Sequence, residues 1–327
     1  MSQPSTAAPV ETLRRGPVGR TAAAAPAGEA AERDSAVRPV FIVGTGRCGS
    51  TLVHEVLARH PAFGFISNVD DRLAFLDPAG RWNGVLLRSP LARAGSGARW
   101  RFAPSEAYRL IGTRVSPMYV NSTRDLTAAD VTPWIRRRFR AFFEARARAQ
   151  RCPQFLHKYT GWPRLGFFAG IFPEARFVHV VRDGRAVANS WLQMPWWTGW
   201  RGPENWNWGP LPPALAEEWE RGGRSFHLLA AICWKLLMEA FERAQRELPP
   251  QSLLVLRYED FLDAPEEAVD RILHFCGLDW TPRFRREVTG WPLDGGRRNA
   301  YGRDLSPQQV ADMEACLAPL LARLGYS

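Results

Sequence analysis

Lysine is almost missing from this chain of 327 residues. Of its 43 basic residues only Lys158 and Lys235 are lysines, and all the others are arginines. Where arginine predominates so strongly, the positions that keep lysine are candidates for chemistry that arginine serves less well, although chance retention explains either one alone equally well. The formal net charge is +10. This charge predicts either an anionic ligand or a generally basic, solvated surface.

Long hydrophobic runs are also missing. No stretch of about 18 apolar residues occurs, so we expect no segment that spans a membrane. Residues 1–37 are rich in Ala, Pro, Ser, Thr and Gly, hold no aromatic residue, and balance four arginines with four acidic residues. This composition predicts a disordered tail, and its longest uncharged run, 21–28, is interrupted by Pro26 and does not resemble a signal peptide. We therefore expect a cytoplasmic protein whose residues 38–327 form one α/β domain.

The cysteines lack the spacing of a metal site. There are five, with no Cys-x-x-Cys pair among them. Their scatter and their odd number argue against a zinc site and against a disulfide framework, and a reducing compartment is the simplest expectation. No other cluster of metal-ligand residues stands out, so we expect no metal to be required.

The most informative segment is 39–57, Pro-Val-Phe-Ile-Val-Gly-Thr-Gly-Arg-Cys-Gly-Ser-Thr-Leu-Val-His-Glu-Val-Leu. The apolar residues 40–43 predict a buried strand, a glycine-rich turn follows over 44–49, and an amphipathic helix begins at Ser50. Glycines in such a turn let backbone N–H groups converge on an anion, and the N-terminus of the helix adds partial positive charge. The segment therefore predicts a phosphate-binding loop.

This loop differs from the loop of nucleoside triphosphatases. Those proteins place a lysine directly after the second glycine. Here Gly44 and Gly49 keep the spacing, but Ser50 occupies the lysine position and the cation of the loop is Arg47. A loop without that lysine is poorly suited to hold the β- and γ-phosphates of ATP.

Two aspartates follow the next predicted strand, 61–67. In an open α/β sheet the strand after the first helix commonly lies beside the first strand, so its carboxyl end opens onto the same crevice. We therefore expect Asp70 and Asp71 to lie near the phosphate loop. A carboxylate there can act as a general base, and it can equally well cap the helix that follows.

Two further segments are less regular. Residues 78–125 mix Pro, Gly, Arg and Trp without periodicity and predict an insertion or lid with short helices. Residues 130–150 are helical in pattern, with Pro133 at an early position. The apolar face of this helix is expected to comprise Trp134, Ile135, Phe139, Phe142 and Phe143.

A second strand-turn-helix unit lies within residues 154–193. Residues 155–158 predict a buried strand that ends at Lys158, and a helix follows over 162–172. Residues 175–181 predict another buried strand, after which Arg182-Asp-Gly-Arg-Ala-Val-Ala-Asn-Ser opens a helix. Arg182 can supply a bidentate fork, and Ser190 a hydroxyl, to a second anion. Two anion sites at one edge of a sheet predict a ligand with two separated anionic groups.

Together these two units resemble the sulfotransferase superfamily, whose members use 3′-phosphoadenosine-5′-phosphosulfate. Residues 41–52 are similar to the family's 5′-phosphosulfate loop, with Cys48 in place of the usual serine. Residues 176–190 are similar to its 3′-phosphate motif. Downstream, 253–261 is similar to the family's Arg-Tyr-Glu-Asp segment, and 297–303 to the basic segment that closes over the nucleotide, with Tyr301 where tryptophan is usual.

The resemblance implies a fold, a cosubstrate and a set of site residues. The fold is a P-loop-containing three-layer α/β sandwich with a central, mostly parallel sheet flanked by helices. The implied cosubstrate is 3′-phosphoadenosine-5′-phosphosulfate, used without a metal. Arg47 then stabilises the oxygen that leaves with the 5′-phosphate, and Lys158 binds the transferring sulfuryl group or the acceptor. The implied nucleotide-binding residues are Gly44, Thr45, Gly46, Arg47, Cys48, Gly49, Ser50, Thr51, Arg182, Ser190, Tyr258, Arg298, Asn299 and Arg303.

An acceptor hydroxyl or amine also needs a base. Relatives often use Glu or His, and bacterial-type members place a carboxylate just after the second strand. Asp70 is the best positional match, Asp71 is next, and His157 is a less favoured candidate. His54 is expected to be packed in the core rather than to act in catalysis.

Residues 191–213 predict a tryptophan-rich loop near the site, and a long helical stretch follows over 215–248. Six tryptophans lie within residues 191–208, interleaved with Pro, Gly and Asn. Indole rings stack on sugars or flat apolar molecules, which favours a carbohydrate, lipid or natural-product acceptor, and a loop held by its own aromatic cluster is equally compatible.

The sequence thus predicts a sulfotransferase that acts on a small-molecule, glycan or lipid acceptor. The alternatives are a nucleotide-dependent small-molecule kinase and a non-catalytic nucleotide- or carbohydrate-binding protein. No recognisable module interleaves aromatic and basic residues, so we expect no nucleic-acid partner. No residue pattern identifies the acceptor or an oligomeric state.

Overall fold

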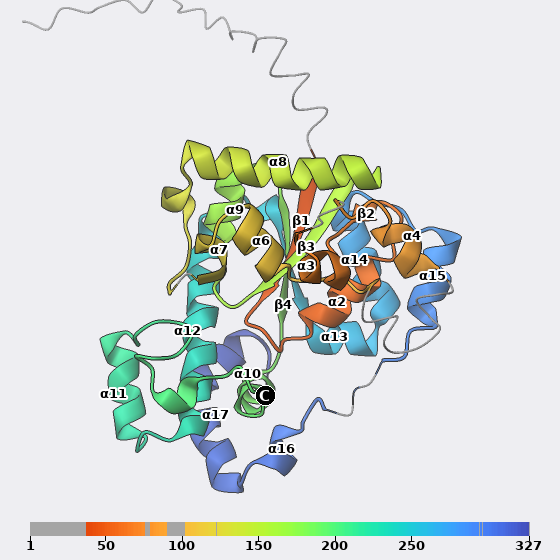
Figure 1. Cartoon of the computed structure of the whole chain (residues 1–327). Coiled ribbons are helices and arrows are strands. Elements are labelled where there is room, and N and C mark those ends of the chain that lie inside the picture. The colour runs from red at the N-terminus through yellow and green to blue at the C-terminus, as the bar shows by residue number, and fades with distance from the viewer. Residues whose placement is uncertain are drawn as a thin grey trace, which may run out of the picture. The chain divides into compact units, whose positions relative to one another are not determined.

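A five-stranded parallel sheet forms the centre of the protein (Figure 1). This computed structural model describes residues 37–75, 79–89, 102–121, 123–293, 295 and 297–326. The predicted tail, 1–37, lies outside the described residues except for Val37. The strands are β1 (Arg38–Gly44), β2 (Phe63–Gly64), β3 (Gln154–Thr160), β4 (Arg176–Val181) and β5 (Leu253–Arg257). Their order in the sheet is β2-β3-β1-β4-β5.

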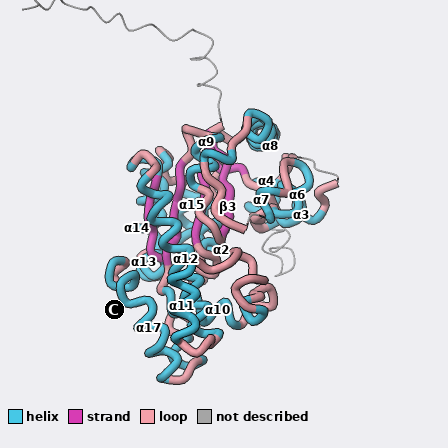
Figure 2. Tube along the Cα trace, turned by 90° about the vertical axis from the view of Figure 1, so that its left-hand side faces the viewer, coloured by secondary structure: helices cyan, strands magenta, loops and turns pink. Residues whose placement is uncertain are grey.

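The two faces of β1 pack against different helices, because its side chains alternate between them. Val40 and Ile42 lie in one buried cluster, and Phe41 and Val43 lie in another. The helices on the first face are α2 (Ser50–Leu57), α14 (Pro265–Cys276) and α15 (Pro282–Thr289). The helices on the second face are α6 (Tyr108–Arg114), α7 (Met118–Asn121), α8 (Pro133–Gln150) and α9 (Leu165–Ile171). Figure 2 shows α14 on one side of the strands and α6, α7 and α8 on the other, which confirms the predicted three-layer α/β fold.

A third apolar cluster lies beyond the carboxyl end of the sheet. It is formed by α10 (Gly184–Leu192), α11 (Pro213–Arg221), α12 (Phe226–Arg246) and α17 (Pro307–Arg323), together with tryptophans of the segment that follows α10. The remaining short helices are α3 (Asn68–Arg72), α4 (Asn83–Arg88), α13 (Tyr258–Asp263) and α16 (Tyr301–Asp304). No helix in the described ranges is both long and apolar enough to cross a membrane.

Most predicted elements are confirmed, with some changes in their bounds. Helix α8 begins at Pro133 and is capped by the Thr132 hydroxyl, but Trp134, expected on its apolar face, is 51% exposed. The helix predicted over 162–172 begins only at Leu165. The stretch 215–248 forms two helices rather than one, because the chain turns between α11 and α12, where Gly223 has a φ of 68°.

The expected place of the second strand is wrong. β1 pairs with β3 along seven residues on one side and with β4 on the other, so both of its edges are occupied. β2 is only two residues long and pairs with β3 at the edge of the sheet. The segment after β2 is therefore separated from β1 by a whole strand.

Candidate active site

A cavity of about 790 Å³ opens at the carboxyl ends of β1, β3 and β4. Because the strands are parallel, the segments that follow them all reach this edge of the sheet. Thr45 and Gly46 come from the segment after β1, Thr160 from the end of β3, and Arg182 from the residue after β4. The cavity is thus built where the two strand-turn-helix units meet.

The predicted phosphate loop lies against this cavity. Gly46 and Gly49 have φ values of 83° and 91°, and Arg47 also adopts the left-handed region with a φ of 56°. At Gly49 an added Cβ would lie 2.1 Å from the ring of Tyr258, so only glycine fits between the loop and that ring. The loop residues that line the cavity are Thr45, Gly46, Arg47, Gly49, Ser50 and Thr51.

Two residues of the predicted loop do not line the cavity. The Cys48 side chain is fully buried, and its Sγ would lie 2.5 Å from a Cβ added at Gly44. Gly44 thus makes room for a thiol that points into the core. Their contribution to a bound ligand is therefore limited to backbone groups.

The structure brings Arg47, Arg182 and Ser190 together. Arg47 Nε donates to Ser190 Oγ at 2.9 Å. Arg182 donates from Nη1 to the backbone carbonyl of Arg47 at 3.1 Å and from Nη2 to that of Arg297 at 3.0 Å, and its guanidinium lies over the Tyr258 ring at 4.9 Å. Residues more than 130 positions apart in sequence therefore form one basic site.

This site is crowded with positive charge. Five arginines line the cavity, at positions 47, 164, 182, 297 and 298, against two glutamates at 55 and 106. The pKa of Arg47 is lowered first by burial, then by the charges of Arg182 and Arg297. The Nε of Arg182 is buried and has no hydrogen-bond partner among the described residues. An anionic ligand would relieve both the repulsion and the unmet donor.

Lys158 lies at the other end of the phosphate loop. It is only 5% exposed, and its Nζ donates to Thr51 Oγ1 at 2.7 Å. The same Nζ lies 2.7 Å from Glu106 Oε1. The other lysine, Lys235, instead pairs with Glu218 at 2.8 Å between α12 and α11. Of the two lysines, Lys158 is the one in contact with the cavity lining.

Glu106 is the carboxylate that sequence reasoning missed. It lines the cavity just before α6, and its Oε1 also accepts from Thr160 Oγ1 at 3.4 Å. A signal was present, because Glu106 and Asp125 are the only acidic residues in the segment 78–125. That segment has no periodicity, so nothing local indicated which residue would face the site.

The structure does not place Asp70 or Asp71 at the cavity. Asp70 is buried in a capping box at the start of α3, where its Oδ2 accepts from the Ser67 backbone N–H at 2.9 Å and also from Asn83 Nδ2. Asp71 Oδ1 accepts from the Leu110 backbone N–H at 2.8 Å. Both carboxylates serve local structure, and the expectation that they approach the phosphate loop is wrong because β3 lies between β2 and β1.

Two histidines weighed as candidates are buried in the core. His157 is fully buried, its Nε2 lies 3.1 Å from Tyr119 Oη, and burial lowers its pKa to about 3. Burial also holds the pKa of His54 well below its usual range. Neither lines the cavity, so neither can reach an acceptor there.

The basic segment near residue 300 contributes only in part. Arg297 and Arg298 line the cavity, and Arg298 Nη2 pairs with Asp263 Oδ1 at 2.6 Å. Asn299 and Arg303, which the resemblance placed at the nucleotide, are not among the residues that line the cavity. The sequence motif therefore overestimates how much of this segment faces the site.

Aromatic side chains form the remaining wall. Trp162, Trp196 and Trp208 line the cavity together with Tyr108. Trp208 also packs against Trp191 and Trp206, with ring centroids at 5.3 and 5.4 Å. The tryptophan-rich segment thus does both things expected of it, since it stabilises itself and presents rings to the cavity. Trp191 belongs to α10 rather than to the loop.

The comparisons with known proteins agree with this geometry. A model of the sulfotransferase family matches residues 39–282. Sulfotransferase STF9 from Mycobacterium avium is 17% identical, with a TM-score of 0.55 over 89% of this chain and 78% of that chain. The sulfotransferase domain from the curacin biosynthetic pathway is 14% identical, with a TM-score of 0.50 over 89% of this chain and 98% of that one. No curated protein sequence matches the chain. These two structures share its fold, and because the family model matches more than half of its residues, the chain belongs to the sulfotransferase family.

Proposed function

We propose that the protein transfers a sulfuryl group from 3′-phosphoadenosine-5′-phosphosulfate to a hydroxyl or amine of a carbohydrate, lipid or natural-product acceptor. The observation that carries this proposal is the convergence of Arg47, Arg182 and Ser190 in one cavity. A volume of about 790 Å³ is in the range of sites that hold a nucleotide-sized ligand.

The lining residues fit the two anionic ends of this cosubstrate. Arg182, with its unmet buried Nε, and the Ser190 hydroxyl would bind the 3′-phosphate. Backbone donors of residues 45–51, at the N-terminus of α2, would bind the 5′-phosphosulfate. Arg298 would add a further cation at the 3′ end. When bound, the cosubstrate supplies an electrophilic sulfur.

The same side chains can support an in-line transfer. Glu106 accepts the proton from the acceptor oxygen or nitrogen while that atom forms a bond to sulfur. The bond between sulfur and the bridging oxygen breaks, and Arg47 stabilises the negative charge that this oxygen keeps as adenosine 3′,5′-bisphosphate leaves. Lys158, held by Thr51 and Glu106, orients the sulfuryl oxygens.

Glu106 replaces the aspartates as the proposed base. It is the carboxylate that both lines the cavity and contacts Lys158 at the end of the phosphate loop. A base must come within hydrogen-bond reach of the proton it removes, and the carboxylates of Asp70 and Asp71 face the backbone of their own segment instead.

The aromatic wall supports an acceptor with a flat or ring-shaped body. Trp196 is 44% exposed and lines the cavity, while Tyr108 and Trp162 line it from the other strands' loops. Faces of indole and phenol rings stack on sugar rings and on flat apolar molecules. The proposed acceptor therefore presents its hydroxyl or amine from a body of this kind.

Calorimetric titration without added metal tests the proposed donor. We expect adenosine 3′,5′-bisphosphate to bind with a micromolar Kd, far more tightly than adenosine 5′-monophosphate or magnesium ATP, and Arg182→Ala to abolish most of this preference. Arg221→Ala, an exposed arginine of α11, is the matched control and should bind like the wild type. Tighter binding of magnesium ATP would instead support a kinase.

A further inference from the structure

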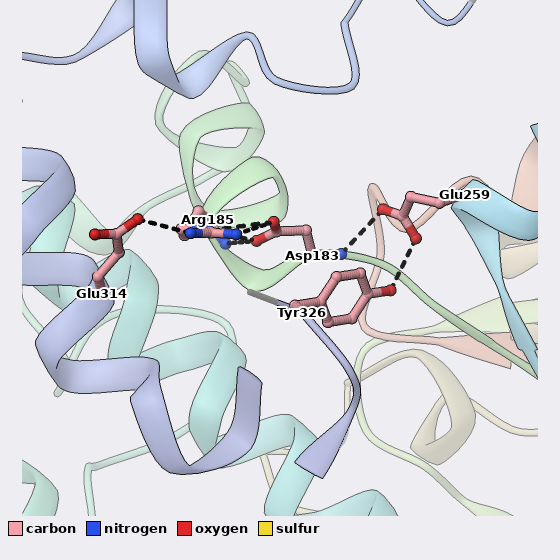
Figure 3. Close-up of polar contacts among 5 residues, drawn as sticks. All are labelled: Asp183, Arg185, Glu259, Glu314 and Tyr326. Atoms are coloured by element: carbon pink, nitrogen blue, oxygen red, sulfur yellow. Dashed lines mark hydrogen bonds and ion pairs between the residues drawn. The ribbon is translucent and has the colours of Figure 1, made fainter. Parts of the chain in front are cut away.

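A chain of polar contacts links the residues after α17 to the segment that carries Arg182 (Figure 3). We infer that Glu259, Glu314 and Tyr326 are positioning residues, which fix this segment in the geometry that binds the 3′-phosphate of the donor. The inference rests on the proposed function. None of the three lines the cavity, so each would act through residues that do.

Glu259 controls the backbone directly after Arg182. Its Oε1 accepts from the Asp183 backbone N–H at 3.3 Å. The preceding residue, Tyr258, lies under the Arg182 guanidinium at 4.9 Å. The start of α13 therefore holds Arg182 twice, by its side chain through a ring and by its following peptide through a carboxylate.

Tyr326 fixes Glu259 from the opposite side. Its hydroxyl donates to Glu259 Oε2 at 2.8 Å, so the two carboxylate oxygens join Tyr326 to Asp183. The Tyr326 side chain is 8% exposed and its ring lies 4.4 Å from the Arg257 guanidinium carbon. Burial and the charge of Glu259 raise the pKa of Tyr326, so the phenol stays protonated and keeps donating.

Glu314 fixes the same segment through a second route. Asp183 caps α10 by accepting from the Arg185 backbone N–H at 2.9 Å, and it also pairs with Arg185 Nη2 at 2.8 Å. Arg185 Nη1 in turn lies 2.6 Å from Glu314 Oε1 on α17. Figure 3 shows the Arg185 guanidinium between the two carboxylates.

The two routes meet at Asp183, which follows Arg182 and begins the helix that carries Ser190. Both proposed 3′-phosphate ligands therefore depend on how this one residue is placed. A site whose ligands are already fixed loses less entropy when the anion binds. Loosening Asp183 should weaken binding of the 3′-phosphate and leave binding of the 5′ end unchanged.

This selectivity gives a direct test. We would measure the Kd of adenosine 3′,5′-bisphosphate and of adenosine 5′-monophosphate by calorimetry for wild type, Tyr326→Phe and Glu314→Gln. Each variant should bind the bisphosphate about 5- to 10-fold more weakly, the scale of one lost hydrogen bond to a charged group, and should bind the monophosphate as the wild type does. The double variant should lose more than either single variant.

Asp312→Asn is the matched control, because it removes a carboxylate of α17 that contacts His227 at 3.2 Å rather than Arg185. Equal weakening of both ligands, or of neither, in Tyr326→Phe and Glu314→Gln would overturn the inference, and so would the same selective loss in Asp312→Asn. A wild-type protein that does not prefer the bisphosphate would overturn the proposed function and, with it, this inference. The two failures are therefore distinguishable.

Discussion

Carboxylates near this site differ in what their oxygens already bind. The oxygens of Asp70 and Asp71 accept from backbone N–H groups of a capping box and of α6, whereas Glu106 lines the cavity and contacts Lys158. Catalysis by a positioned base typically contributes a factor of about 10² to 10⁴. We therefore expect Glu106→Gln to lower kcat by roughly this factor while the Kd of adenosine 3′,5′-bisphosphate stays unchanged.

The matched control for this prediction is Asp71→Asn. It makes the same change from carboxylate to amide, but at a residue whose Oδ1 serves the Leu110 N–H, and an amide oxygen can still accept there. We expect kcat to stay near that of wild type and the melting temperature to fall slightly. Acceptor turnover measured with labelled cosubstrate distinguishes the two, and an Asp71→Asn protein as impaired as Glu106→Gln would remove the reason for choosing Glu106.

Among the elements, those set by local sequence were predictable. The strand before the phosphate loop and the helix that begins at Ser50 follow from apolar runs and from glycine. Helix α14 has the predicted bounds because Pro265 opens it and Gly277, with a φ of 65°, ends it. These signals lie within a few residues of the element they define, so no tertiary information is needed to read them.

The order of the strands was not predictable in this way. β3 comes about ninety residues after β2 in sequence, yet it lies between β2 and β1. That pairing is decided by which long apolar strands can bury both faces, and the two residues of β2 cannot compete with the seven of β3. The misplacement of Asp70 and Asp71, and the omission of Glu106, both follow from this single tertiary choice.

The parallel sheet also makes stability depend on pH. His157 on β3 and His179 on β4 are fully buried, and burial lowers the pKa of each to about 3. In the unfolded chain a histidine has a pKa near 6.5, so below that pH the unfolded state binds protons that the folded state refuses. Stability is therefore complete above pH 6.5 and falls with acid towards pH 3. Between pH 6.5 and pH 5 each histidine should cost about 2 kcal/mol.

Urea unfolding at pH 7 and pH 5 tests this expectation with His179→Phe. The variant keeps a ring against Phe241, which His179 stacks on at 4.0 Å, but it cannot take up a proton. Its loss of stability between the two pH values should be smaller than that of wild type by about 2 kcal/mol. Val180→Ala, in the same strand, should lower stability equally at both pH values. A His179→Phe protein with the wild-type pH dependence would contradict the assignment.

At the scale of the whole molecule, the net charge of +10 is concentrated functionally where five arginines line one cavity. Repulsion among them costs stability in the free protein, and an anion converts that cost into attraction. Adenosine 3′,5′-bisphosphate should therefore raise the melting temperature, by an amount that grows with its concentration relative to its Kd.

Salt distinguishes this electrostatic binding from stacking of the base. The Debye length falls from about 14 Å at 50 mM salt to about 4 Å at 500 mM, so contacts between phosphates and partly exposed arginines weaken. We expect the bisphosphate Kd to rise about tenfold or more over this range, which removes about 1.4 kcal/mol of ligand-induced stabilisation per tenfold change. Adenosine, which lacks phosphates, is the control and should show little change. Thermal shift measurements at both salt concentrations provide the readout, and a bisphosphate effect as insensitive to salt as that of adenosine would mean that the arginines do not carry the binding.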